Sequence, residues 1–169
     1  MLTIRCETPE DIPAIHHIHT AAFGRPNEAE LVDALRQHNA LTISLVAVQD
    51  GRLVGHIAFS PVTITSSTAI IEALGLAPMA VLPAYQRRGI GSQLVEAGLT
   101  VCQHTSYGVV VVLGHPRYYP RFGFTPAKTH GLVWEHNAPD EAFMVKESQE
   151  GALTQTRGVV KYRPEFATG

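Results

Sequence analysis

A short basic segment, Gln86–Gly91, contains residue types that bind anions. It separates an apolar stretch from one whose apolar residues recur at helical spacing. The first turn of a helix presents free N–H groups and the positive end of the helix dipole. Gly89 and Gly91 lack a Cβ, so a phosphate can approach the backbone, and Arg87 and Arg88 add positive charge. The pattern predicts a strand, a loop that fits a diphosphate, and a helix.

The two commonest nucleotide-binding motifs do not match this segment. A P-loop needs Gly-Lys-Ser/Thr after a longer glycine-rich loop, and Gln86–Gly91 contains no lysine. A dinucleotide-binding loop needs a third glycine three residues after Gly91, where Leu94 stands. The residues therefore exclude both classes and leave another phosphate-containing ligand.

The hexapeptide resembles the Gln/Arg-x-x-Gly-x-Gly/Ala loop with which the GNAT superfamily of N-acetyltransferases holds the pyrophosphate of coenzyme A. A second segment, Tyr119–Phe124, follows the apolar run Val109–Leu113 and resembles the Tyr-x-Lys/Arg-x-Gly-Phe sequence after the family's fifth strand. The two segments occur in the family's order and at its separation. The resemblance covers residues 1–127 in element order and is specific over residues 74–124.

The resemblance implies an α+β (α/β) fold in a single acyl-CoA N-acyltransferase (GNAT-like) domain over residues 1–169. A mixed central sheet of about seven strands is flanked by helices, and strands 4 and 5 splay apart where the cofactor lies. His115 stands near the position of an asparagine that contacts coenzyme A in many members, so it either replaces that contact or faces the acceptor. The contacts implied for acetyl-CoA, with no metal, are Met79, Ala80, Val81, Gln86, Arg87, Arg88, Gly89, Ile90, Gly91, Ser92 and His115.

Tyr119 matches the family's usual general acid. A phenol with a pKa near 10 can donate a proton to a departing thiolate of similar basicity, whereas Tyr118 is expected to pack. The alternative is that both tyrosines are amphipathic residues at the edge of the core. The resemblance therefore makes Tyr119 the candidate catalytic residue.

The general base is left open by the motifs. Some members carry a glutamate on the fourth strand, where this sequence has Gly75, and Glu72 should face the other side of that strand. A water relay, Glu28, Glu30 or His115 remain candidates, as does an amine that arrives already neutral.

The acceptor wall in this family comes from the two leading helices and the loop between them. Phe23, Glu28 and Glu30 are therefore the candidate acceptor contacts, and either carboxylate could hold a cationic amine. The alternative is that both carboxylates only favour the start of a helix.

Three nearby histidines, His16, His17 and His19, invite comparison with a metal site. On a helix His16 and His19 are neighbours while His17 points elsewhere, and no carboxylate or thiol at ligand spacing completes a set. We expect solvent-facing and groove-facing histidines instead.

Composition fits one enzyme-sized, weakly acidic domain. The 169 residues carry a formal net charge of -2, which argues against nucleic acid or an anionic membrane as a partner. The acidic N-terminus and the lack of a run of roughly 18 apolar residues predict a cytoplasmic protein. Cys6 and Cys102 are expected to be buried, reduced thiols. The oligomeric state is open, with a homodimer as one option.

The elements expected around the motifs follow from periodicity and turn residues. Asp50-Gly51 predicts a tight hairpin turn, Thr8 begins a first helix and Asn27 a second. The strands are expected at residues 2–6, 43–49, 53–64, 69–81, 109–113, 132–134, 142–145 and 159–162. The apolar helix faces are expected to be Ile12, Ile15, His16, His19 and Phe23 in the first helix, Leu31, Leu35 and His38 in the second, and Ile90, Leu94, Ala97 and Val101 in the third.

Two functions from different classes follow from the resemblance. The first is an N-acetyltransferase that moves an acetyl group from acetyl-CoA to a primary amine of a small molecule or protein by direct attack. The second is a non-catalytic acyl-CoA-binding sensor or regulatory module. The presence of both Tyr119 and the complete glycine loop favours the enzyme.

Overall fold

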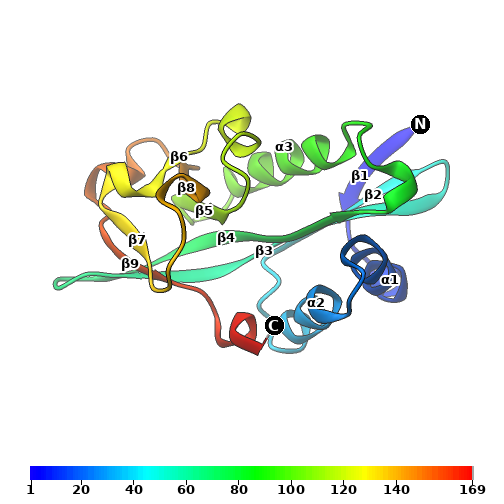
Figure 1. Cartoon of the computed structure of the whole chain (residues 1–169), viewed down its shortest axis with the longest axis horizontal. Coiled ribbons are helices and arrows are strands. Elements are labelled where there is room, and N and C mark those ends of the chain that lie inside the picture. Colours follow the sequence, from blue (N-terminus) through cyan, green and yellow to red (C-terminus); the bar gives the residue numbers. More distant parts are fainter. Residues whose placement is uncertain (169) are drawn as a thin grey trace. The chain divides into compact units, whose positions relative to one another are not determined.

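The computed structural model describes residues 1–168, with side chains through Ala167 (Figure 1). The α-helices are α1 (Ile12–Phe23), α2 (Asn27–Gln37) and α3 (Ile90–Cys102). The strands are β1 (Leu2–Cys6), β2 (Ile43–Gln49), β3 (Arg52–Thr65), β4 (Ile70–Val81), β5 (Val109–Leu113), β6 (Thr125–Pro126), β7 (Leu132–Trp134), β8 (Phe143–Glu147) and β9 (Gly158–Lys161). Short 3₁₀ turns cover Pro9–Asp11, Pro83–Tyr85, Tyr119–Phe122, Ala127–His130, Asp140–Ala142, Ala152–Gln155 and Pro164–Thr168.

The chain forms two compact units. The first comprises Met1–Ser60, Ala77–Thr100 and the segment from Pro164 onward. The second comprises Pro61–Leu76 and Val101–Arg163. The strands β3 and β4 each contribute residues to both units.

In the first unit, β1 and β2 pair antiparallel, and β2 continues into β3 through a tight turn. Asp50 and Gly51 have φ values of 50° and 82°, so both turn residues adopt the left-handed conformation of a type I′ hairpin turn. The helices α1 and α2 lie side by side (Figure 1). Ile15, Val32 and Val46 join α1, α2 and β2 in one apolar cluster.

The buried faces of α1 and α2 differ from those predicted. The buried residues of α1 are Ile15, Ile18 and His19, while Phe23 is 42% exposed. The buried residues of α2 are Ala29, Val32 and Leu35. Ile15, His19 and Leu35 are buried as predicted, whereas Ile18, Ala29 and Val32 were not included in the predicted faces.

The inner face of α3 shows the same effect. Ile90 and Leu94 are buried as predicted, but Val95 and Leu99 replace Ala97 and Val101 on the buried side. Gly98 packs directly against Phe59, since a Cβ at this glycine would lie 2.7 Å from the Cζ atom of the ring. A glycine contributes nothing to an apolar pattern, so the sequence did not reveal the point of closest approach.

In the second unit, the strand order is β9-β3-β4-β5-β8-β6, with β7 beside β9. β4 and β5 are parallel, as predicted, and their ladder consists of the pairs Leu74–Val110 and Gly75–Val111. This short ladder agrees with the expected splay of strands 4 and 5. The described residues contain nine strands, slightly more than the predicted seven or so, and β6 is the one that the expected strand ranges did not include.

Gly158, at the start of β9, is a position that should tolerate no side chain. Its φ is 138°, and a Cβ here would lie 2.7 Å from the carbonyl carbon of Thr65. We expect Gly158→Ala to lower the free energy of unfolding by about 2 kcal/mol, because backbone cannot move aside as a flexible side chain can. Urea unfolding measures the change.

Gly151→Ala is the matched control for this substitution. Its φ of 82° is also positive, but nothing lies within 4 Å of the added Cβ. Equal stability losses in the two variants would contradict the proposed clash at Gly158.

Among the described residues, no helix combines the length and apolar character that a membrane crossing requires.

Candidate functional site

The basic glycine loop lies on the surface, where an anion can reach it. β4 ends at Val81, and the exposed residues Gln86–Gly89 lead into α3, which begins at Ile90. Gly89 has a φ of 80°, a conformation that strongly favours glycine. Its carbonyl accepts a bond from the Gln93 N–H at 3.1 Å, which opens the helical ladder. Helix α3 therefore begins directly after an exposed loop, which is the arrangement that the anion-site prediction expects.

Two arginines lie against one aromatic ring beside this loop. The guanidinium carbon of Arg88 is 5.3 Å from the centroid of the Tyr85 ring, and that of Arg52 is 5.7 Å from the same centroid. Cation–π contacts of this kind favour these positions over free rotation of the side chains. Arg52 was not predicted, since it belongs to β3 and carries no signal in the loop motif.

The end of β4 has one backbone group already engaged. The side-chain amide of Gln86 donates a hydrogen bond of 2.9 Å to the Val81 carbonyl. Met79 and Val81 are half-buried, whereas Ala80 is 5% exposed. The Gln86 side chain therefore fixes the turn that follows β4.

Tyr119 lies in the second unit, in an aromatic environment that suits a proton donor. Its ring packs edge-on against Tyr118 at 5.1 Å and against Phe124 at 5.8 Å between centroids. Burial raises the pKa of Tyr119 to about 12, so the phenol keeps its proton at neutral pH. A Cβ at Gly114 would come within 3.0 Å of the Tyr119 ring, so this glycine provides the space the ring occupies.

The neighbours of Tyr119 have structural contacts of their own. The guanidinium carbon of Arg121 is 4.6 Å from the centroid of the Tyr118 ring, which agrees with a packing role for Tyr118. His115 is exposed, and its Nδ1 accepts a hydrogen bond of 3.2 Å from the Arg117 N–H. The Nε2 atom is then the part of His115 suited to an outside contact.

The candidate acceptor residues of the first unit have different environments. Arg25 binds both carboxylate oxygens of Glu28, at 3.0 and 2.5 Å, and thereby lowers the pKa of Glu28. Glu30 is exposed, and the Phe23 ring stacks on the His19 ring. A pocket of about 420 Å³ is lined by Arg25, Asn27, Glu28, Glu30, Leu31, Ala34, Glu165 and Phe166.

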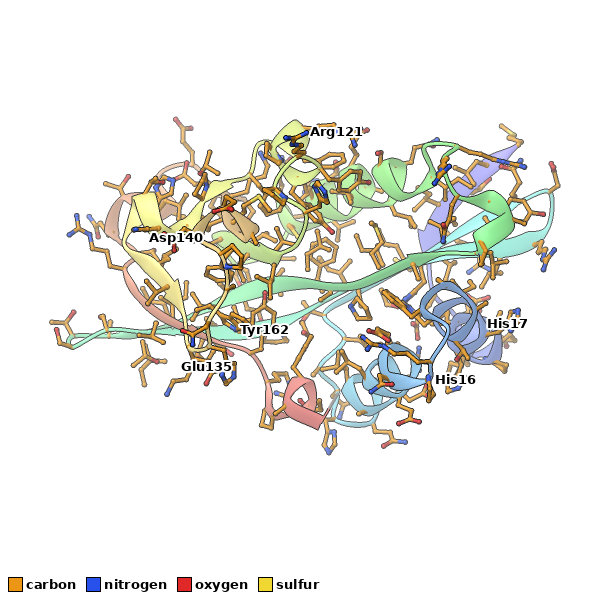
Figure 2. The ribbon with its side chains drawn as sticks, in the orientation of Figure 1. His16, His17, Arg121, Glu135, Asp140 and Tyr162 are labelled. Atoms are coloured by element: carbon orange, nitrogen blue, oxygen red, sulfur yellow. The ribbon has the colours of Figure 1, made fainter. Side chains whose placement is uncertain are left out.

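The three clustered histidines of α1 differ in exposure. His17 is exposed as predicted, and Nδ1 of His16 lies 2.8 Å from an oxygen of Asp33; Figure 2 shows both histidines on α1. His19 is buried on the inner face of α1, as its place in the helix predicted, and does not face solvent; its Nε2 lies 2.8 Å from Nδ1 of His56. Its partner is 37 residues away on β3, beyond any local pattern. The described residues contain no cluster of three or more potential metal-binding side chains.

Two further predictions concern thiols and a catalytic carboxylate. Cys102 is buried and its burial raises the pKa of the thiol to about 12. Cys6 is exposed, contrary to prediction, because β1 leaves its last residues open to solvent.

At Gly75 a Cβ would lie 2.8 Å from the Tyr162 ring and 2.9 Å from Val62, so a glutamate does not fit here without repacking.

Comparison with known proteins identifies the family. Residues 3–127 match the model of the acetyltransferase (GNAT) domain. The uncharacterized N-acetyltransferase YhbS of Escherichia coli strain K12 is 37% identical over 98% of each chain. The crystal structure of Escherichia coli YhbS in complex with CoA superposes with a TM-score of 0.91 and covers 98% of this chain and 92% of that one. A GNAT family acetyltransferase from Brucella melitensis in complex with acetyl-CoA is 37% identical, with a TM-score of 0.81 over 98% of each chain.

These matches extend well beyond the two motifs from which the resemblance was drawn. They confirm the predicted α+β fold and agree with the parallel pairing of β4 and β5. The chain belongs to the GNAT family of acetyltransferases.

Proposed function

We propose that this protein is an acetyl-CoA-dependent N-acetyltransferase that acetylates a primary amine of a small molecule or protein. The observation that carries the proposal is the exposed loop Gln86–Gly89 at the start of α3, with Gly89 held at a φ of 80°. The loop has the residues with which the family binds pyrophosphate. Relatives at 37% identity were crystallised with CoA and with acetyl-CoA, which supports the same cosubstrate here.

The donor set around the loop fits a diphosphate. Backbone N–H groups from Gly89 to Ser92 would bind phosphate oxygens, and the cationic side chains Arg87 and Arg88 would balance their charge. Arg52, held on the Tyr85 ring, adds a third cation beside the loop. The N–H groups of Met79 to Val81 would bind the rest of the cosubstrate and polarise its thioester carbonyl.

The chemistry proposed for the chain is direct attack by a neutral amine on the thioester. Tyr119 would donate its proton to the departing thiolate, and its raised pKa ensures that the proton is present. His115 is proposed as a further cosubstrate contact through Nε2. Phe23, Glu28 and Glu30 are proposed to contact the acceptor.

Isothermal titration with acetyl-CoA tests the phosphate loop. We expect the triple variant with Arg88→Glu, Gly89→Ala and Gly91→Ala to bind at least about tenfold more weakly than the wild type, a loss of about 1.4 kcal/mol. The variant removes a cation, adds a repelling carboxylate and places Cβ atoms where phosphate must approach.

Arg157→Glu is the control for net charge, since it makes the same charge change at an exposed position of the second unit. Equal weakening by both variants would show a general charge effect rather than a phosphate loop. Failure of the folded wild type to bind acetyl-CoA would contradict the proposed function.

The alternative, a non-catalytic acyl-CoA sensor, draws on one observation. Gly75 stands where some members of the family carry a glutamate, and a larger residue here would require repacking of Tyr162 and Val62. A screen of primary amines for thiol release from acetyl-CoA separates the two functions, since a sensor binds acetyl-CoA and releases no thiol with any amine.

A further inference from the structure

A series of hydrogen bonds in the first unit joins buried histidines to a partly exposed carboxylate. His19 on α1 and His56 on β3 are both 0% exposed, and their facing nitrogens, Nε2 and Nδ1, are 2.8 Å apart. The other nitrogen of His56, Nε2, is 2.8 Å from the hydroxyl oxygen of Ser44 on β2. Ser44 in turn donates to the carboxylate of Glu7. The series therefore crosses three elements before it reaches a side chain that is 18% exposed.

An arginine holds the carboxylate at the outer end of the series in place. Arg36 on α2 donates two hydrogen bonds to the two carboxylate oxygens of Glu7, at 2.9 and 3.0 Å. Its remaining terminal nitrogen donates to Asp33 at 3.2 Å. This bidentate pair fixes the orientation of the Glu7 carboxylate, which accepts the hydrogen bond from Ser44.

The direction of the Ser44 hydrogen bond sets the tautomers of both histidines. Because the Ser44 hydroxyl donates to Glu7, its oxygen accepts a bond from Nε2–H of His56. A neutral His56 then carries a lone pair on Nδ1, which accepts from Nε2–H of His19. In neutral His19 the remaining nitrogen, Nδ1, is therefore the basic one.

The basic nitrogen of His19 lies next to the candidate acceptor contacts. Among the described residues, Nδ1 of His19 has no hydrogen-bond partner, although the side chain is fully buried. The Phe23 ring stacks on the His19 imidazole with centroids 6.2 Å apart and an angle of 3° between the planes. The Glu28 carboxylate interacts electrostatically with the same imidazole. A buried polar atom without a partner is costly, which points to a function for this nitrogen.

We propose that His19, His56, Ser44 and Glu7 form a proton relay that deprotonates the acceptor amine, with Nδ1 of His19 as the first proton acceptor. This inference rests on the proposed acetyltransferase function and supplies its missing general base. One N–H bond of the ammonium breaks and an N–H bond forms at Nδ1 of His19. The proton on Nε2 of His19 moves to Nδ1 of His56, that on Nε2 of His56 moves to Ser44, and the Ser44 proton moves to Glu7. The amine is left neutral, and solvent takes the proton at Glu7. Both histidines are left as Nδ1–H tautomers, and they return to the Nε2–H form before the next turnover.

Burial keeps both histidines of the relay in their neutral forms. Burial lowers the pKa of His19 to about 4; Glu28 and Asp33 oppose this shift, and His16 adds to it. Burial also lowers the pKa of His56 well below its usual value, with smaller contributions in the same direction from His19 and Arg36. Both histidines are therefore neutral at pH 7, so each keeps one N–H and one lone pair, as the relay requires.

The tautomers can be measured without knowledge of the acceptor. Long-range ¹H–¹⁵N spectra of the full chain labelled with ¹⁵N-histidine distinguish Nε2–H from Nδ1–H imidazoles, and the variants His19→Gln and His56→Gln assign the signals. We expect both His19 and His56 as neutral Nε2–H tautomers at pH 7. An Nδ1–H tautomer of His19, or a charged His19, would overturn the relay.

Kinetics with two amines of similar size and different basicity test the role in catalysis. Ethylamine is charged at pH 7 and needs a base, whereas 2,2,2-trifluoroethylamine is already neutral. With acetyl-CoA and ethylamine, we expect His19→Gln to lower kcat/KM about 100-fold at pH 7 and progressively less as pH rises toward the pKa of the amine. With trifluoroethylamine we expect little change. The glutamine amide can still donate to His56, which limits structural damage.

Two further variants separate a relay from a structural role. Ser44→Ala interrupts the series at a half-buried position and should give the same dependence on pH and amine. His17→Gln is the matched control, since His17 is an exposed histidine of the same helix outside the series. Equal losses with both amines at every pH would overturn the relay and indicate a structural effect. Absence of thiol release by the wild type with any primary amine would instead contradict the proposed function, whatever the tautomers.

Discussion

Replacing Tyr119 with phenylalanine is expected to lower kcat for acetyl transfer about 100-fold, the lower range for loss of a general acid. Affinity for acetyl-CoA should be unchanged, because the ring and its contacts with Tyr118 and Phe124 are retained. Without the phenol, the thiolate must leave unprotonated or take a proton from water. Stopped-flow measurement of thiol release and titration with acetyl-CoA provide the two values.

Tyr118→Phe is the matched control, since it removes a hydroxyl from the adjacent ring. Equal losses of kcat in the two variants would contradict a specific role for Tyr119. The pKa of Tyr119 at about 12 adds a second expectation. The phenol stays protonated through about pH 10, so its ionisation should cause no loss of activity below that pH. A decline below pH 10 that disappears in Tyr119→Phe would contradict the assigned burial of the phenol.

Acidification from pH 7 to pH 4 is expected to destabilise the first unit strongly. In the folded chain burial lowers the pKa of His19 from 6.5 to about 4. Above pH 6.5 the imidazole is neutral in both states, and it has no effect. As pH falls from 6.5 to 4, His19 binds a proton in the unfolded chain but stays neutral in the folded chain, so the free energy of unfolding decreases. The shift corresponds to a loss of about 3 kcal/mol that is complete below pH 4.

His56 should add to this loss, because its pKa is also lowered in the folded chain. Urea unfolding at several pH values between 7 and 4 measures the slope, and His19→Gln should flatten it whereas His17→Gln should not. The ion pair of Asp11 with Arg5 lowers the pKa of Asp11 from 3.8 to about 2, so its contribution is lost in a more acidic range. Unchanged stability from pH 7 to pH 4 would contradict the buried, neutral state of both histidines.

The elements that the sequence predicted well are those set by local chemistry. Asp50 and Gly51 adopt the positive φ values that their residue types favour, and this fixes the β2–β3 hairpin. The continuous apolar run of β5 was assigned correctly as a buried strand parallel to β4. The helix faces were less accurate, because Gly98 and its contact with Phe59 depend on a strand remote in sequence.

The residues of the candidate site also differ in whether local sequence could predict them. The phosphate loop was predictable because glycines and arginines in one short segment determine its charge and backbone freedom. The relay was not, since Glu7, Ser44, His56 and His19 come from four segments and meet only in the fold. One available signal was His56 itself, a titratable residue within the apolar pattern of β3. Burying such a residue costs free energy unless it forms hydrogen bonds in the folded chain.

Because the two cysteines differ in exposure, thiol-reactive labels should modify a single site on the folded protein. Cys6 is exposed, whereas Cys102 is buried and its thiol has a pKa of about 12, so a maleimide dye added to the folded chain should react at Cys6 alone. The dye would be attached one residue before Glu7, so its fluorescence should respond to structural changes around that carboxylate. The same thiol adds one equivalent per chain to the background of any assay that counts released coenzyme A with a thiol reagent.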